Sequence, residues 1–360
     1  MEDKVNRYAR IKYKLALTDL ALTLFLLVIL QASGFALWLK ASLSNLSNNP
    51  FILTAAYCLT IFLIYSAISF PLDLYRSFII EHQFGLSKQR IFSWGLDYIK
   101  SNALGLLIFI ILMESFFFFI RAYTGSWWWM SAIFWILLTV VIARIFPVIV
   151  IPLFFKYKKI ENDALRRRIL DLAAKMNVKI LDVFEIDFSK KSLKANAAFV
   201  GIGKSKRVLL TDTLLGGKFL PEEIEMILAH EFAHFRFKHL LKMVAINALV
   251  ILLIFYIFFR LDQTGIDVKD IANLGTWLML FMLFQIILTP FMNWMSRIME
   301  RNADCAAIKV LRNKESFISM MEKLGEQNLS QRYPPLWAKI FFYDHPPIGE
   351  RVEFARKMET

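Results

Sequence analysis

The sequence predicts a mainly α-helical, polytopic membrane protein that carries a small α+β catalytic domain. Of its 360 residues, 57% are hydrophobic and 20% are charged, whereas a soluble domain has about 45–50% apolar and about 25% charged residues. The apolar residues are concentrated in six runs, each able to cross a hydrocarbon layer of ~30 Å. One long polar stretch, residues 156–239, separates the fourth run from the fifth.

Each run is near the ~20 residues that a membrane-spanning helix needs at a rise of ~1.5 Å per residue. The first run is longer than the roughly 7–15 apolar residues of a signal peptide, so we expect a retained anchor. We therefore expect about six transmembrane helices, over Leu15–Leu39, Phe51–Pro71, Leu104–Ile120, Trp127–Phe155, Leu240–Phe259 and Ile271–Trp294.

Lys and Arg alternate between the connecting segments and so predict the orientation in the membrane. Basic residues fill the segment before the first run, the loop 73–102 and the segment after Phe155. By contrast, Ala41–Pro50 carries no charge and Leu261–Asp270 is acidic. Because cytoplasmic loops are enriched in Lys and Arg, we expect both termini and residues 156–239 on the cytoplasmic side.

The polar stretch between the fourth and fifth runs is predicted to form an α+β domain. Asp163–Met176 is charged and periodic, as in an amphipathic helix. Val178–Ile186 and Ala198–Thr211 are rich in Val, Ile, Leu and Phe and are predicted as short strands. Pro221 and the two acids after it favour the start of a helix. The chain is thus predicted to contain membrane helices one to four with a cytoplasmic loop (1–155), this domain (156–239), membrane helices five and six (240–295) and a C-terminal cytoplasmic segment (296–360).

Charge and cysteine content narrow the possible partners. The formal net charge is +13, which the basic cytoplasmic loops explain. No basic patch interleaved with aromatic residues is present, so we expect no nucleic-acid partner. Cys58 and Cys305 lie far apart and indicate neither a disulfide framework nor a CxxC site. Any metal must therefore be bound by histidine and carboxylate side chains.

The predicted helix from Pro221 contains the string His230-Glu231-Phe232-Ala233-His234. Residues four apart share one face of a helix, so both imidazoles can reach one Zn²⁺. Glu231 is then placed to take a proton from water that the metal activates. The string alone leaves open a juxtamembrane helix with solvated histidines.

A catalytic zinc needs three protein ligands and one open position. Cys58 lies within the second apolar run and is a poor candidate for the third ligand, whereas Glu300 follows the sixth run. Asp304 shares a helix face with Glu300 and could accept a hydrogen bond from a ligand histidine. The predicted orientation places Glu300 on the same membrane side as the two histidines. Ordinary charged residues at the end of a membrane helix are the alternative.

A third candidate element lies near the C-terminus. Pro346 and Pro347 prevent a helix from continuing and hold His345 on a turn. A histidine held beside a zinc site can donate a hydrogen bond to a developing oxyanion. The alternative is a loop histidine without a role in the site.

Taken together, these motifs resemble the type 1 CAAX prenyl protease family, in the family's order and over most of the chain. They also distinguish the chain from the related four-span heat-shock peptidases. The motifs are HEFAH, Glu300–Asp304, His345-Pro346-Pro347 with Glu350-Arg351, Ala195–Gly201, Lys206–Leu215, Phe70-Pro71 through Ile79-Ile80-Glu81, Phe84-Gly85-Leu86 and Ile151–Phe154.

The resemblance implies a barrel of membrane helices around a large chamber. A zincin-like site with one zinc ion per chain would lie near the cytoplasmic mouth of this chamber. The implied ligands are His230, His234 and Glu300, and Glu231 is the implied general base. An integral-membrane zinc metalloendopeptidase is therefore our leading hypothesis.

The resemblance also implies a substrate and the residues that hold it. Family members cleave prenylated or other membrane-delivered peptides close to a C-terminus. The implied partners are the lipid bilayer and a peptide or protein substrate that can be lipidated. His345 resembles the oxyanion donor, and Arg351 a cation that braces the site or the substrate. The residues that resemble a substrate-pairing edge strand, or lie beside the site, are Ala195, Asn196, Ala197 and Gly201.

Two further hypotheses remain open at this point. A quality-control peptidase that removes misfolded membrane segments would use the same residues. A channel or transporter with a structural zinc would instead use intramembrane polar residues such as Asp19 and Glu114 as a pathway. Glu231 distinguishes the enzyme hypotheses from the channel or transporter hypothesis, because a structural zinc site has no use for a base and usually takes four protein ligands. Six runs and a short connection before Pro221 favour a bacterial or archaeal relative in the inner membrane, whereas a eukaryotic member would lie in an ER-type membrane.

Overall fold

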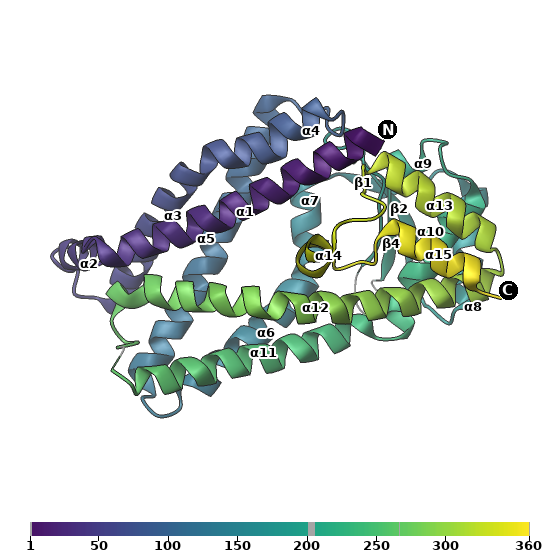
Figure 1. Cartoon of the computed structure of the whole chain (residues 1–360). Coiled ribbons are helices and arrows are strands. Elements are labelled where there is room, and N and C mark those ends of the chain that lie inside the picture. The colour runs from purple at the N-terminus through teal and green to yellow at the C-terminus, as the bar shows by residue number, and fades with distance from the viewer. Residues whose placement is uncertain (1, 201–205, 266, 360) are drawn as a thin grey trace.

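The structure is a computed structural model that describes residues 2–200, 206–265 and 267–359. Gly201, expected beside the substrate, lies outside the described residues. Long helices dominate the fold (Figure 1). Six helical segments of the described chain are long and apolar enough to cross a membrane, which confirms the predicted fold class. They are α1 (Glu2–Ala32), α3 (Pro50–Leu74) with its extension to Gln83, α5 (Ile91–Ala122), α6 (Trp127–Ile145), α11 (His239–Asp262) and α12 (Leu274–Leu311) with a preceding 3-10 turn η4 (Ile271–Asn273).

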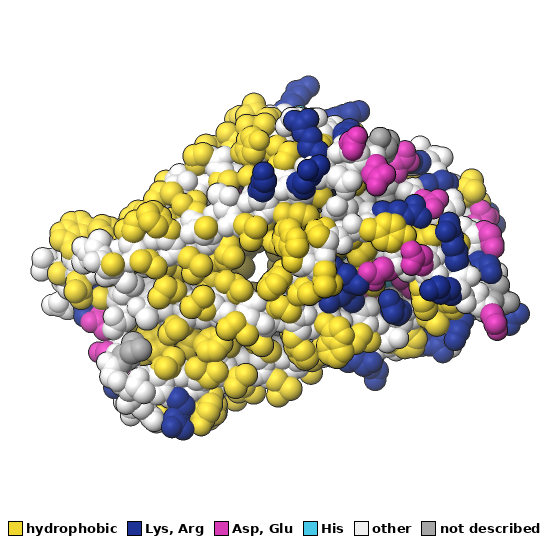
Figure 2. Space-filling view, in the orientation of Figure 1, with side chains coloured by type: hydrophobic (Ala, Val, Ile, Leu, Met, Phe, Trp, Pro, Cys, Tyr) yellow, Lys and Arg dark blue, Asp and Glu magenta, His cyan; other side chains and the backbone are white. Residues whose placement is uncertain are grey.

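The six long helices form a closed ring. In cyclic order α1, α3, α5, α6, α11 and α12 each pack against the next helix, and α12 returns to α1. Figure 2 shows a hollow among hydrophobic side chains near the middle of one face of this ring. The arrangement is the barrel that the family resemblance implies.

Helix ends differ from the predicted runs at two places. The first run is broken because α1 ends at Ala32 and Gly34 adopts φ +76°, a conformation that glycine tolerates at no steric cost. A short helix, α2 (Phe35–Ser44), follows. The fourth run stays helical beyond Ile145, but it changes there to a π-helical turn and then a short α-helix that ends at Phe154, because its prolines lack the amide donors of a regular helix. The short segments in the extensions are η1 (Tyr75–Ile79), α4 (Ile80–Gln83), η2 (Phe146–Val150) and α7 (Ile151–Phe154).

One end of the ring is closed by an aromatic core. Tyr57, Phe117 and Trp127 are fully buried there, and Phe255 and Trp277 are almost so. These rings come from α3, α5, α6, α11 and α12, so a single core joins five of the six helices. Apolar burial of this kind is the main stabilising term in folding.

The other end of the molecule carries the predicted α+β domain. Its four strands have the order β1-β2-β4-β3, in which β2 and β4 are parallel and the other pairs antiparallel. Among the described residues β3 is an edge strand, and the predicted run from Val178 becomes a strand only at Asp182. The elements are β1 (Tyr157–Lys159), α8 (Asp163–Lys175), β2 (Asp182–Ile186), β3 (Ala197–Val200), β4 (Arg207–Thr211), α9 (Asp212–Leu215) and α10 (Pro221–Arg236).

The C-terminal helices complete this end, which we call the sheet end. α13 (Lys314–Gln327) packs against α10, and both α14 (Leu336–Phe342) and α15 (Ile348–Lys357) pack against α12. Both ends of the described chain lie here (Figure 1), and charged side chains gather here (Figure 2). The last membrane helix α12 continues unbroken to Leu311, and so connects the barrel with the sheet end. The four-part division of the chain stays a prediction.

Candidate metal centre

The helix α10 begins at Pro221 as predicted, because several local features favour a start there. Proline at the first position needs no amide partner, and the Glu223 carboxylate accepts a hydrogen bond from the Leu220 amide at 2.8 Å. Along one face, Ala229, Phe232 and Ala233 are fully buried in the core. This packing presses α10 against α12, which carries the third predicted ligand.

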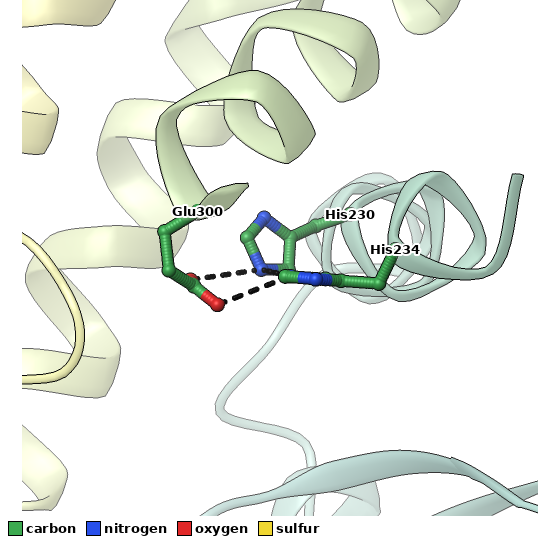
Figure 3. Close-up of side chains that lie close together, drawn as sticks. All are labelled: His230, His234 and Glu300. Carbon is green, nitrogen blue, oxygen red and sulfur yellow. Dashed lines mark hydrogen bonds and ion pairs between the residues drawn. The ribbon is translucent and has the colours of Figure 1, made fainter. Parts of the chain in front are cut away.

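His230, His234 and Glu300 converge between α10 and α12 (Figure 3). The Nε2 atoms of His230 and His234 lie 3.2 Å and 3.1 Å from the two carboxylate oxygens of Glu300. One potential ligand atom from each residue lies within 4.8 Å of the others. The structure therefore brings the three predicted ligands together from two helices that are distant in the sequence.

The chemistry of this group fits a divalent metal. Oε2 of Glu300 is buried and receives no hydrogen bond from the described residues, although His230 lies close to it. Two imidazole nitrogens and a carboxylate oxygen form one of the ligand sets that catalytic zinc uses, with a fourth position left for water or substrate. The residues present thus fit the predicted ion.

Asp304 and Arg351 hold the ring of His230 from behind. Nδ1 of His230 lies 2.8 Å from Oδ1 of Asp304, which is 1% exposed, and Arg351 donates to both oxygens of Asp304. This leaves Nε2 as the nitrogen that faces Glu300. Burial lowers the pKa of His230, but the neighbouring carboxylates of Asp304 and Glu300 outweigh burial and raise that pKa to about 9. Arg351 therefore contacts Asp304 directly and stabilises the carboxylate that orients His230.

A residue without a predicted role, His239, holds the second ligand. Its Nδ1 lies 3.0 Å from Nδ1 of His234, so Nε2 of His234 is left to face Glu300. In a continuous helix two residues five apart would point about 140° away from each other. Lys238, with φ +55°, breaks the chain between α10 and α11 and turns His239 back toward the site. The only sequence signal was a third histidine soon after the motif.

Glu231 lines the same pocket as His230, in a volume of about 390 Å³. Burial raises the pKa of the Glu231 carboxyl, and the neighbouring imidazoles oppose that rise. An upward shift moves a carboxylate toward the pKa range that suits a general base.

His345 reaches the site from the loop before α15. Its Nε2 lies 3.3 Å from Oε1 of Glu300, and its Nδ1 lies 2.8 Å from the Asp344 carboxylate. The hydrogen bond with Asp344 raises the pKa of His345, although burial opposes it. The ring is half exposed, so it borders the pocket and remains accessible to a substrate.

Three of the residues expected along the substrate line the same pocket. Ala195, Asn196 and Ala197 line the pocket that also contains His230 and Glu231. Ala197 begins the edge strand β3, and the amide of Asn196 donates to Oγ1 of Thr211 at 3.0 Å. Among the described residues, an edge strand thus lies beside the candidate ligands, and its role toward a substrate stays a prediction.

A closed ring of membrane helices, an HExxH helix and a carboxylate from the last membrane helix together define an integral-membrane metalloendopeptidase. Comparison with known families agrees with this class. The chain belongs to peptidase family M48, whose model matches residues 159–359. A second model, described as the CAAX prenyl protease N-terminal region with five membrane helices, matches residues 2–156, where the described chain has four of its candidate spans.

Individual relatives cover most of the chain. An uncharacterized metalloprotease, YhfN of Bacillus subtilis, is 30% identical over 99% of this chain and 85% of its own length. CAAX prenyl protease 1 of Saccharomyces cerevisiae is 30% identical over 79% of this chain and 68% of its own. The crystal structure of S. mikatae Ste24p superimposes with a TM-score of 0.86 and 25% identity, covering 98% of this chain and 88% of that one. The predicted family and enzyme class are thereby confirmed.

Proposed function

We propose that the chain binds one zinc ion through His230, His234 and Glu300 and hydrolyses peptide bonds close to the C-terminus of membrane-associated or lipidated peptides. The observation that carries this proposal is the convergence of three potential ligand atoms within 4.8 Å of one another. They lie on a pocket that also contains Glu231 and the edge strand.

Each residue of the site has a defined part in this reaction. Zinc, when bound, supplies a Lewis acid that activates water and polarises a carbonyl group. Glu231 accepts the proton of the attacking water and passes it to the leaving amine. His345 donates a hydrogen bond to the carbonyl oxygen as negative charge develops there. Asp304 and His239 keep the ligand histidines in the tautomer that leaves Nε2 free.

The orientation in the membrane is part of the proposal. Lys and Arg are concentrated in the first turns of α1 and in the segment after α7, and both lie at the sheet end. Because such segments favour the cytoplasmic side, the termini and the site belong on that side of an inner-type membrane. A substrate would then reach the site from the cytoplasmic face of the bilayer.

Two substrate classes have support. Relatives named CAAX prenyl proteases favour a lipidated peptide, and residues of α1, α3 and α12 line an apolar cavity of about 630 Å³ that suits an apolar chain. The relative that covers 99% of this chain is a bacterial metalloprotease that does not carry that name. The same chemistry would also serve a quality-control peptidase that cleaves unlipidated membrane segments.

Metal stoichiometry of the purified chain tests the ligand set. We expect one zinc per wild-type chain and a clear loss in Glu300→Ala, because removing a buried ligand opens the site. Glu322→Ala is the matched control, since Glu322 forms a surface ion pair with Arg332 and does not line the candidate pocket. Full stoichiometry and unchanged affinity in Glu300→Ala would remove this residue from the site. Cleavage of one peptide with and without a lipid group separates the two substrate classes.

A further inference from the structure

The side chain of Asn328 closes one end of the open edge of β3. Its Oδ1 accepts a hydrogen bond from the Ala195 amide at 3.0 Å, and its Nδ2 donates to the Ala195 carbonyl at 3.3 Å. A primary amide that bonds both backbone groups of one residue copies the pairing of a neighbouring strand. Asn328 therefore occupies the position at Ala195 where another backbone would otherwise pair.

Hydrogen bonds of the next residue show that Ala195 faces away from the sheet. Asn196 directs both backbone groups toward Thr211 of β4, donating to its Oγ1 at 3.0 Å and accepting from its amide at 3.1 Å. Successive residues of an extended chain direct their backbone groups to opposite edges. Ala195 and Ala197 thus share the outer edge, where Asn328 covers both backbone groups of Ala195. At Ala197 the amide donates to Oδ1 of Asn196 at 2.9 Å, so its carbonyl is the group that faces the pocket edge without a bond from Asn328.

The neighbours of Asn328 hold it firmly in this position. Gln327 donates from Nε2 to the Leu193 carbonyl at 2.9 Å. Leu329 has φ +49°, is 6% exposed and packs in a core with Tyr8. A leucine with positive φ persists only where its surroundings over-determine the backbone. The turn after α13 is therefore built to keep this asparagine against the strand.

The covered edge and the candidate catalytic groups belong to one pocket. Asn328, Ala197 and Glu231 all line the volume of about 390 Å³, together with the apolar side chains of Met321 and Leu324. A peptide paired with β3 therefore has Glu231 and Asn328 as walls of the same pocket. Because Asn328 already pairs with Ala195, the part of the peptide that extends toward Asn328 must be short.

We propose that Asn328 is a specificity-determining residue that ends the substrate-pairing edge at Ala195 and so decides which peptide bond is cleaved. A substrate can pair from Ala197 onward but not along Ala195. Only a short segment then fits on the Asn328 side of Glu231, which selects substrates with a chain end near the scissile bond. This inference rests on the proposed function, since it takes β3 as the strand that receives the substrate.

Two ladders of synthetic apolar peptides test the proposal, one lengthened by single residues at the C-terminus and the other at the N-terminus. In one of the two peptide series, we expect the wild type to cut at a constant number of residues from one terminus of the peptide. Asn328→Ala frees both groups of Ala195, so cut sites read by mass spectrometry should shift by about two residues, the repeat of one strand edge. Longer peptides should gain about tenfold or more in kcat/KM relative to the wild type, from two added backbone hydrogen bonds.

Asn313→Ala is the matched control. Asn313 caps the other end of α13 by accepting a hydrogen bond from the Ser316 amide at 2.9 Å, so its loss weakens the same helix without touching the strand. This variant should keep the wild-type cut site.

Unchanged cut sites and relative rates in Asn328→Ala, with metal retained, would overturn the role of Asn328. If Asn328→Ala loses its metal, Asn328→Asp is measured instead: it keeps the size and still accepts from the Ala195 amide, but it cannot donate to the Ala195 carbonyl, so a smaller gain for longer peptides is expected. A wild type that binds zinc but cleaves no peptide would contradict the proposed function instead.

Discussion

The two ends of the barrel differ in how their buried side chains are held. At the sheet end, Asp304 contacts both His230 and Arg351, and the buried carboxylate of Glu223 accepts hydrogen bonds from Ser319 and Lys323. At the aromatic end, polar atoms of Tyr57, Trp127 and Ser131 are buried without a hydrogen-bond partner among the described residues. Directional bonds therefore organise one end, and apolar packing organises the other.

The hydrogen-bonded sheet end carries the candidate site, whereas the aromatic end serves as the scaffold. A site that must hold ligand atoms in a set geometry needs side chains whose rotamers are locked by hydrogen bonds. An aromatic core needs only close packing, and it tolerates a few unpaired polar atoms because ring burial outweighs their cost. Matched substitutions at the two ends should consequently have unequal effects.

The largest difference is expected between two glutamates. Glu231→Gln should lower peptide cleavage by about 10²–10⁴-fold or more, because an amide cannot accept the proton of the attacking water, while zinc stays bound. Glu114→Gln changes a partly buried carboxylate of α5 near the aromatic end and should leave kcat/KM within about twofold. Cleavage assays with metal analysis of both variants check this, and comparable losses would contradict the division between the ends.

An intermediate effect is expected for the histidine behind the second ligand. His239→Leu removes the partner of His234 Nδ1 and should weaken zinc affinity by about 10–100-fold, as measured by competition with a chelator. His239→Asn keeps an acceptor near the Nδ1 position and should restore most of the affinity.

The control for this prediction is His82→Leu. His82 lies in α4, where its ring bonds the Phe78 carbonyl at 2.7 Å, and it does not line the candidate pocket. Equal zinc affinity in His239→Leu and His82→Leu would show that His239 has no part in holding the metal.

The smallest effect is expected in how the stability of the sheet depends on pH. A hydrogen bond from Arg166 lowers the pKa of Asp182 in the folded state, with help from the Val183 amide and Lys159. The resulting stabilisation, about 1.5–3 kcal/mol, is complete above the ordinary aspartate pKa of about 4 and is lost as the pH falls below it.

Hydrogen exchange measured against pH checks this expectation. Strands β1 and β2 should lose protection in acid before the aromatic end does, and Asp182→Asn should remove most of that pH dependence. Parallel loss of protection at both ends, or an unchanged pH profile in the variant, would argue against charge as the source of stability at the sheet end.

Local sequence patterns were sufficient to predict much of the candidate site. The HExxH spacing places His230 and His234 on one helix face whatever surrounds them, because helical periodicity is a property of the backbone. Hydropathy revealed the six membrane helices for a similar reason, since a bilayer demands long apolar runs. Glu300 followed from its place after the sixth run and from the need for a third ligand, and the structure brings it to the two histidines.

Other features had no local signal. The break after Ala32 and the short strand β1 depend on conformations that a hydropathy profile does not contain. The contact between His239 and His234 depends on one residue, Lys238, in the left-handed region. Gly201 lies outside the described residues, so its expected place on the edge strand stays a prediction, as do the roles of Arg351 and Asn196 toward a substrate.

The sequence by itself thus determined the membrane helices, the α+β domain, the motif and the class of enzyme, because each depends on short-range periodicity or on a spacing along one helix. Only the tertiary structure decided what stands behind each candidate ligand and which side chain covers the backbone of Ala195. Asn328 bonds a residue 133 positions away, and such a pairing depends on how α13 docks against β3. Contacts of that range are set by packing of whole elements, which no local pattern records.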